Sequence, residues 1–124
     1  MDGCGKEIRL HDAGHALRIK KNQAIEEFYS DDATMQENFG AMRRGRDAMA
    51  AHEEAVLGSV KGITTRPGSA YAIDGDLVMV RWVFDIVQAD GKGFTLDEVA
   101  CQRWRGDRIA QERFYYDPAQ RKPA

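Results

Sequence analysis

The chain has 124 residues, of which 43% are hydrophobic and 31% are charged. This balance predicts one packed domain with a solvated surface and argues against a disordered chain. The formal net charge of −2 offers no basic surface for nucleic acid, and no apolar run is long enough for a transmembrane helix. We therefore expect neither nucleic-acid nor membrane binding.

The N-terminal string MDGCGKEIRLHD has no apolar segment of the kind found in secretory signals. Cys4 and Cys101 are too few for a disulfide framework. Both observations predict a reduced, cytoplasmic protein.

The first half of the chain has the spacing of amphipathic helices. From Glu7 to Lys21, apolar residues recur on one helical stripe and predict a first helix. Asn22 is placed to cap a second helix over residues 23–33. A third helix is predicted from Arg46 to Leu57, with Gly58 as its stop signal.

The second half of the chain changes to the period of β strands. Strands are predicted over residues 77–87, 94–105 and 108–116, separated by the turn strings DGD, DGKG and GD. A weaker strand from Ile63 to Ile73 is interrupted by the string RPGS. Helices followed by consecutive strands predict an α+β fold with an antiparallel meander rather than βαβ units.

Alternation along these strands assigns their two faces. One face of the first strand is wholly apolar and is expected to point towards the helices: Val78, Val80, Trp82, Phe84 and Ile86. The same alternation predicts the inner face of the second strand as Leu96, Glu98, Ala100, Gln102 and Trp104. On the third strand it predicts Ala110, Glu112, Phe114 and Tyr116.

Three strings, FYSDDATMQENFG, GRDAMAAHE and RWRGDRIAQERFYYDP, resemble the SnoaL-like and ketosteroid-isomerase-like branch of the nuclear transport factor two superfamily. The resemblance extends over residues 10–118, so we expect residues 1–124 to form a single SnoaL-like domain. It implies three N-terminal helices packed on a strongly bent antiparallel sheet. Helices and sheet together would form a cone that encloses a pocket.

The resemblance also implies where isomerase groups would fall. The carboxylate that moves a proton in ketosteroid isomerases falls on Glu37, followed here by Asn38 where that family usually has proline. The oxyanion-side acid falls on Ala100, and two tyrosine donors fall near Ala13 and on Glu53. Because an enolate needs such donors, we expect little 3-oxosteroid isomerase activity.

Carboxylates on an otherwise apolar inner face are candidate catalytic groups. Buried polar groups are retained when they are paired or used, which favours Glu98 and Glu112. His52 lies on the apolar face of the third predicted helix, and an imidazole close to either carboxylate would suit general acid–base catalysis. The alternatives are a solvated cone mouth, salt bridges across a slipped register and, for His52, an ordinary core residue.

The remaining pocket assignments follow from the same parity. We expect the ligand to contact Tyr29, Trp82, Phe84, Gln102, Trp104, Phe114 and Tyr116. At the rim, the resemblance favours Glu37, but a one-residue slip would substitute Gln36 or Asn38.

Two further clusters are weak candidates. His11 and His15 lie four residues apart and could face a metal together, but no HExxH string or third ligand accompanies them, and we expect a solvated helix face. We therefore expect no metal and no cofactor. The basic string MRRGR, residues 42–46, is expected to be an exposed loop, with anion binding as the alternative.

These features predict a small-molecule pocket protein with cofactor-free proton-transfer chemistry. Its substrate would be a modest apolar or carbonyl-bearing molecule that is isomerised, cyclised, dehydrated or opened as an epoxide. A non-catalytic ligand-binding or dimerisation module is the alternative. A homodimer is expected through the outer sheet face, with Leu77, Met79, Val83, Val99, Cys101, Ile109 and Tyr115 amid Arg81, Arg103 and Arg113.

Overall fold

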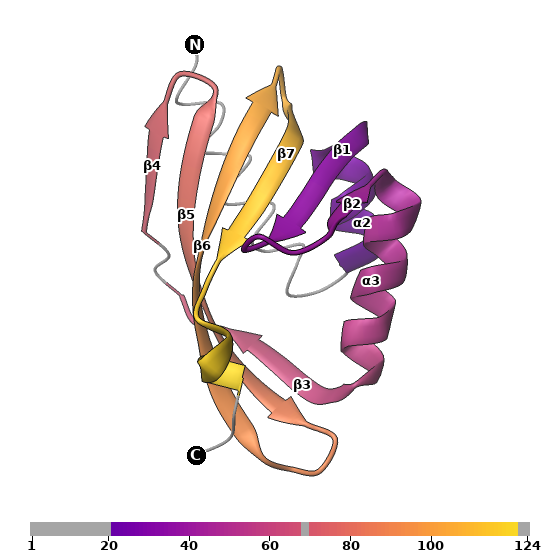
Figure 1. Cartoon of the computed structure of the whole chain (residues 1–124), viewed down its shortest axis with the longest axis vertical. Helices are drawn as coiled ribbons and strands as arrows, with labels where there is room; N and C mark the ends of the chain where they lie inside the picture. Colours follow the sequence, from indigo (N-terminus) through magenta and orange to yellow (C-terminus); the bar gives the residue numbers. More distant parts are fainter. Residues whose placement is uncertain (1–20, 68–69, 122–124) are drawn as a thin grey trace.

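The computed structural model describes residues 21–67 and 70–121. Within them lie two α helices, α2 (Lys21–Phe28) and α3 (Arg46–Gly58), and a short 3-10 helix, η1 (Pro118–Arg121). The strands are β1 (Tyr29–Glu37), β2 (Met42–Arg44), β3 (Val60–Thr65), β4 (Tyr71–Asp74), β5 (Leu77–Gln88), β6 (Gly93–Arg105) and β7 (Arg108–Tyr115). Figure 1 shows a strongly curved sheet with α3 facing its concave side.

The sheet runs in the order β2-β1-β7-β6-β5-β3, with β4 also paired to β5. Strands β5, β6 and β7 form the antiparallel meander that the sequence predicts. The weak strand predicted from Ile63 to Ile73 is in fact two strands. β3 pairs with the end of β5 near Phe84, and β4 pairs with its beginning near Leu77, so both lie along the same edge of β5.

The prediction of an all-antiparallel sheet is wrong, because β1 pairs with β7 in parallel. The pairing extends from Tyr29 opposite Ile109 to Glu37 opposite Phe114. It exists because the second helix ends at Phe28 rather than at residue 33, and the chain then enters the sheet directly.

The number of N-terminal helices is not confirmed by this structure. The first predicted helix, Glu7 to Lys21, lies outside the described residues except for Lys21, which is the first residue of α2 as the structure describes it. Asn22 lies within α2 rather than at a cap. The third predicted helix corresponds to α3, which begins at Arg46 and ends at Gly58.

The inner faces predicted for β5 and β6 are confirmed by burial. Their side chains there are buried or half-buried, and Val78 and Ala100 are completely enclosed. On β7, a bulge opposite Trp104 inserts Ala110, so that Trp104 pairs with Ile109. Ile109 is therefore a core residue, and its assignment to the outer face is wrong.

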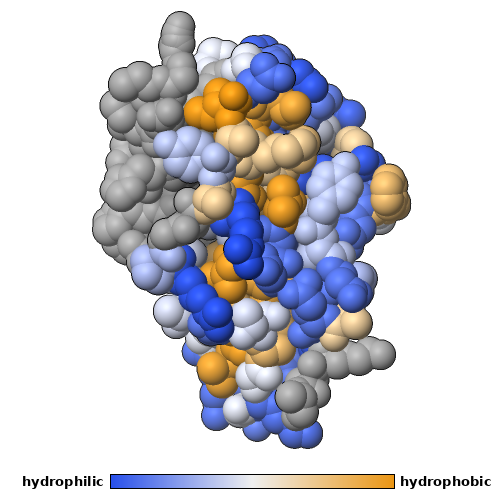
Figure 2. Space-filling view, turned by 90° about the vertical axis from the view of Figure 1, so that its left-hand side faces the viewer, coloured by the Kyte–Doolittle hydropathy of each residue, from blue (hydrophilic) through white to orange (hydrophobic). Residues whose placement is uncertain are grey.

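The outer face of the sheet combines apolar and charged side chains. Met79, Val99 and Tyr115 are each exposed on it. Between them, arginines pair with carboxylates, as Arg81 does with Asp97 at 2.6 Å. Figure 2, which views the molecule from the side of β4 and β5, shows hydrophobic and hydrophilic side chains next to one another.

The C-terminal helix η1 completes the pairing of β6 where β7 has ended. β7 ends at Tyr115, opposite Val99, so within residues 21–67 and 70–121 no strand pairs with the earlier part of β6 on that side. There the Asp97 backbone N–H donates to Gln120 Oε1 at 2.9 Å, and Gln120 Nε2 donates to the Asp97 carbonyl at 3.1 Å. The next residue, Arg121, lines the cavity described below.

Candidate functional site

A cavity of about 350 Å³ lies between the concave face of the sheet and the two helices. This volume is at the small end of the range for ligand pockets, which is about 300–1,000 Å³. Aromatic side chains form much of its wall, and they include Trp82, Phe84, Phe94 and Phe114. Its polar side chains gather in two groups, one around Glu112 and one around Glu37.

Glu112 is the centre of the inner group. Its side chain projects from β7 and the residue is only 3% exposed. The Tyr29 hydroxyl donates to Glu112 Oε1, and Gln102 Nε2 donates to Glu112 Oε2 at 2.7 Å. Trp104 Nε1–H in turn donates to Gln102 Oε1 at 3.1 Å. The carboxyl group is therefore held at both oxygens.

Burial raises the pKa of Glu112 to about 7, although the hydrogen bonds from Tyr29 and Gln102 act in the opposite direction. The nearby Glu53 raises it further. Burial and the adjacent Glu112 carboxyl raise the pKa of Tyr29 well above its usual value. Glu112 can therefore both give and take a proton near neutral pH, while Tyr29 stays protonated.

The backbone register explains how these residues meet. Arg43 on β2 pairs with Met35 on β1, and Met35 pairs with Glu112 on β7. Glu112 pairs with Gln102 on β6. These four residues form one row across four neighbouring strands, with Met35, Gln102 and Glu112 buried on the concave face.

Glu37 is the centre of the second group, at the rim. The Tyr116 hydroxyl donates to Glu37 Oε1 at 2.7 Å. Arg43 Nη1 lies 3.3 Å from Glu37 Oε2, and His52 Nε2 lies 3.4 Å from the same oxygen. Arg121 Nη2 approaches Glu37 Oε1 at 3.5 Å. Burial opposes ionisation, but Tyr116, Arg43, His52 and Arg121 together lower the pKa of Glu37.

The candidate catalytic residues share one cavity. His52, Glu98 and Glu112 all line it, as does Glu37. The structure brings His52 to Glu37, whereas Glu112 contacts Tyr29 and Gln102.

The three rim candidates, Glu37, Gln36 and Asn38, have different surroundings at the end of β1. Glu37 lines the cavity. Gln36 accepts hydrogen bonds from the Arg113 guanidinium, with distances of 3.0 and 2.7 Å. Asn38 leaves the strand with a positive φ of 52° and accepts a hydrogen bond from the Tyr116 backbone N–H.

Most of the expected ligand contacts do line the cavity: Tyr29, Trp82, Phe84, Gln102 and Phe114. Trp104 and Tyr116 are not among the lining residues, but they donate hydrogen bonds to two that are, Gln102 and Glu37. Arg43 and Arg121 also line the cavity, and neither was predicted from the sequence. A three-residue strand shows no period, so the inward orientation of Arg43 could not be read from the string MRRGR.

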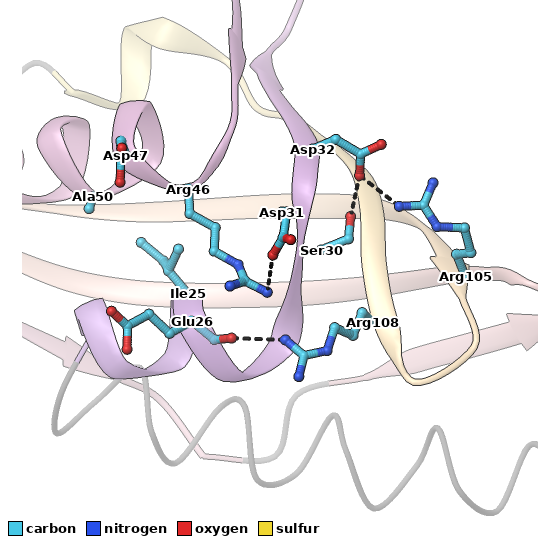
Figure 3. A pocket seen from close by; sticks show the side chains of 10 residues that line it. All are labelled: Ile25, Glu26, Ser30, Asp31, Asp32, Arg46, Asp47, Ala50, Arg105 and Arg108. Atoms are coloured by element: carbon cyan, nitrogen blue, oxygen red, sulfur yellow. Dashed lines mark hydrogen bonds and ion pairs between the residues drawn. The ribbon is translucent and has the colours of Figure 1, made fainter.

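A second, open hollow lies between α2, β1 and the start of α3 (Figure 3). Its three arginines are each bonded within the chain. Arg46 Nη2 lies 2.9 Å from Asp31, Arg105 Nη2 lies 2.6 Å from Asp32, and Arg108 Nη1 donates to a backbone carbonyl. These contacts join the helices to the sheet, so the hollow has a structural role.

Within the described residues, no group of three or more His, Cys, Asp or Glu side chains is placed to hold a metal ion. His11 and His15 lie outside those residues. No helix in residues 21–67 and 70–121 has the length and apolar content needed to cross a membrane.

The chain has an α+β fold with a curved, mixed sheet and a cavity on the concave side of that sheet. The family model of the SnoaL-like domain matches residues 9–112, and the chain belongs to this family. No protein with a curated function matches the chain.

Solved structures share the fold at low sequence identity. An NTF2-like protein of unknown function from Burkholderia pseudomallei superposes with a TM-score of 0.84 at 15% identity, over 96% of this chain and 94% of that one. A protein with a ketosteroid isomerase-like fold from Catenulispora acidiphila, in complex with trimethylamine, has a TM-score of 0.78 at 17% identity, over 90% and 87%. An LEH-like epoxide hydrolase of M. tuberculosis has a TM-score of 0.77 at 15% identity, over 94% and 86%.

Proposed function

We propose that the protein binds a small apolar molecule with an oxygen function and catalyses a proton transfer on it without a cofactor. The observation that carries this proposal is the buried carboxyl group of Glu112. It lines a cavity with aromatic walls, and its pKa is raised to about 7. Acid–base groups work best when their pKa is near the working pH. The SnoaL-like family and the isomerase-like fold of its structural neighbours support this class of reaction.

The proposed step is abstraction of a proton from carbon next to a carbonyl group. The C–H bond breaks, the proton goes to a Glu112 oxygen, and the electron pair forms the enolate. If the proton on Glu112 is replaced by one from solvent before reprotonation, its delivery to the same carbon gives exchange with solvent. Delivery to another carbon gives an isomer. Tyr29 and Gln102 hold the carboxyl group in one orientation throughout.

The test is proton exchange in D2O with three simple ketones: 1-indanone, 2-tetralone and cyclohexanone. Loss of the α-proton signal is followed by NMR for the parent, for Glu112→Gln and for Glu54→Gln, whose side chain is exposed on α3. We expect exchange above buffer with the parent and with Glu54→Gln. Glu112→Gln should lose on the order of 10²–10⁴-fold, the usual contribution of a general base.

A non-catalytic binding module is the second candidate. It is favoured by one observation, which is that both oxygens of Glu112 already accept hydrogen bonds. A parent protein that binds the ketones but exchanges no α proton above the buffer rate would establish this candidate in place of the enzyme.

A further inference from the structure

Arg43 makes fewer side-chain bonds than two other half-buried arginines, Arg46 and Arg113. Among the described residues, the Arg43 side chain has one ion pair, with Glu37 at 3.3 Å, and its Nε is buried without a hydrogen-bond partner. By contrast, Arg46 donates from Nε and Nη2 to the Tyr29 carbonyl, and Arg113 donates from Nε and Nη2 to Gln36. A buried donor without an acceptor costs about 1–3 kcal/mol, and more on a charged group. An arginine left in this state therefore indicates an acceptor that the described residues do not supply.

Arg43 lines the cavity, so its guanidinium is placed to meet an acceptor on a bound ligand. On β2, Met42 and Arg44 are exposed while Arg43 is only partly so, and Arg43 lines the cavity. It stands in the same row as Glu112, with only Met35 on β1 between them. Because neighbouring strands lie about 4.8 Å apart, the two backbones are separated by roughly 10 Å. A small ligand over Met35 would meet the guanidinium on one side and the carboxyl on the other.

The charges around the cavity select the kind of acceptor. Glu37 already balances Arg43, and its lowered pKa keeps it ionised. Glu53, Glu98 and Glu112 also line the cavity. An anionic ligand would add a negative charge among these carboxyl groups, at a cost in free energy. A neutral carbonyl oxygen accepts the same hydrogen bond without that cost.

We infer that Arg43 binds the carbonyl oxygen of an uncharged, apolar ligand and polarises it. This inference rests on the proposed function for its chemistry, since the negative charge that develops on the oxygen while Glu112 removes the α proton would be stabilised by the guanidinium. A fixed donor at a developing oxyanion is a large contribution to such reactions, about 2.7–4 kcal/mol in a well-studied case. Binding of the carbonyl oxygen by Arg43 does not depend on catalysis, so it can be measured without turnover.

The experiment uses 1-indanone labelled with carbon-13 at the carbonyl, titrated into the parent and its variants and followed by NMR. In the parent, the bound carbonyl resonance should move downfield from its position in water. Arg43→Met should lose this shift, and its affinity should fall by about tenfold or more, as expected when a charged hydrogen bond is removed. Arg44→Met removes an exposed arginine from the same strand and should retain both the shift and the affinity.

Two further variants keep the result interpretable. Arg43→Lys retains a cation beside Glu37 but removes the planar set of donors, so it should stay folded and still lose most of the shift. Glu112→Gln should keep the Arg43-dependent shift while losing α-proton exchange. A parent that polarises the ketone without exchanging its protons would overturn the proposed function and leave the role of Arg43 standing.

Three results would overturn the role of Arg43. The first is an equal downfield shift and equal affinity in the parent and in the folded Arg43→Met and Arg43→Lys variants. The second is tighter, Arg43-dependent binding of indane-1-carboxylate, which would make the site one for anions. The third is the absence of saturable binding of 1-indanone to the parent up to its solubility limit.

Discussion

Trp104 fixes the orientation of the Gln102 side-chain amide. The indole N–H of Trp104 can only donate, and it donates to Gln102 Oε1 at 3.1 Å. The amide nitrogen must therefore face the other way, where it donates to Glu112 Oε2 at 2.7 Å. A residue that is not among those lining the cavity thus determines which atom of Gln102 the candidate catalytic carboxyl meets.

Trp104→Phe should release this amide. Because Gln102 Oε1 would be left buried without its donor, we expect the free energy of unfolding to fall by about 1–3 kcal/mol. Urea denaturation of Trp104→Phe, of Gln102→Leu and of the double variant measures the coupling between the two residues, for which we expect about 0.5–3 kcal/mol. Trp82→Phe is the matched control, since it shortens another buried tryptophan, and it should couple less strongly to Gln102→Leu. Additive effects of the Trp104 and Gln102 substitutions would show that the amide is held by other contacts.

The pH dependence of stability should carry the signature of Glu112. Its pKa rises from an ordinary value of 4.5 to about 7 on folding, so between these values the folded state holds a proton that the unfolded state has lost. Stability should therefore fall as the pH rises from about 4.5 to 7 and then level off, by roughly 3 kcal/mol for this group. Below pH 4.5 Glu112 is protonated in both the folded and the unfolded state, so stability no longer changes with pH through this group.

The measurement compares urea unfolding at pH 5 and pH 8 for the parent, Glu112→Gln and Glu54→Gln. The difference between the parent and Glu112→Gln reports the titration of Glu112 together with its effect on the groups that contact it. The exposed Glu54→Gln control should follow the parent. If Glu112→Gln shows the same loss of stability from pH 5 to pH 8 as the parent, the carboxyl of Glu112 does not have a raised pKa.

At the rim, Tyr116→Phe should raise the pKa of Glu37. The Tyr116 hydroxyl donates to Glu37 Oε1 at 2.7 Å and helps to lower that pKa against the effect of burial. Carboxyl carbon-13 NMR across acidic pH would follow the titration of Glu37 in the parent, in Tyr116→Phe and in Tyr71→Phe, which alters an exposed tyrosine. An unchanged Glu37 titration in Tyr116→Phe would mean that Arg43, His52 and Arg121 alone hold the carboxylate ionised.

We propose that the protein is a homodimer through the outer face of the sheet. Met79, Val99 and Tyr115 remain exposed there by 45%, 38% and 40%, among charges that pair within the chain. Sedimentation at micromolar concentration should give a mass near twice 13.9 kDa. Val99→Asp should shift this to a monomer, whereas Leu57→Asp, on the exposed side of α3, should not. A monomeric parent would refute the proposal.

Much of the fold follows from local pattern. The strands β5 and β6 and the helix α3 are long and strongly periodic, and alternation correctly turned Glu98, Gln102 and Glu112 inward. The β1–β7 pairing was not predictable, because it joins residues 29–37 to residues 109–114 through contacts that leave no periodic signal. Tyr29 fits both the helical stripe of Ile25 and Phe28 and a buried strand position, so the end of α2 was read too late.

The chemistry of the site depends on register more than on pattern. Parity shows that Glu112 points inward, but not that its partners are Tyr29, from β1, and Gln102, from β6. The bulge at Ala110 is equally invisible in the sequence, and it alone turns Ile109 into the core. Arg43 was missed because its strand is only three residues long.

The amide of Gln120 takes the place of a peptide group from a missing neighbouring strand. It satisfies both backbone groups of Asp97 on the side of β6 that β7 has already left. Open strand edges of this kind are templates for pairing between molecules, and proteins cover them to avoid aggregation. A single glutamine near the C-terminus therefore helps to protect the chain from self-association through β6. Its loss would show first in the solubility of the protein rather than in its chemistry.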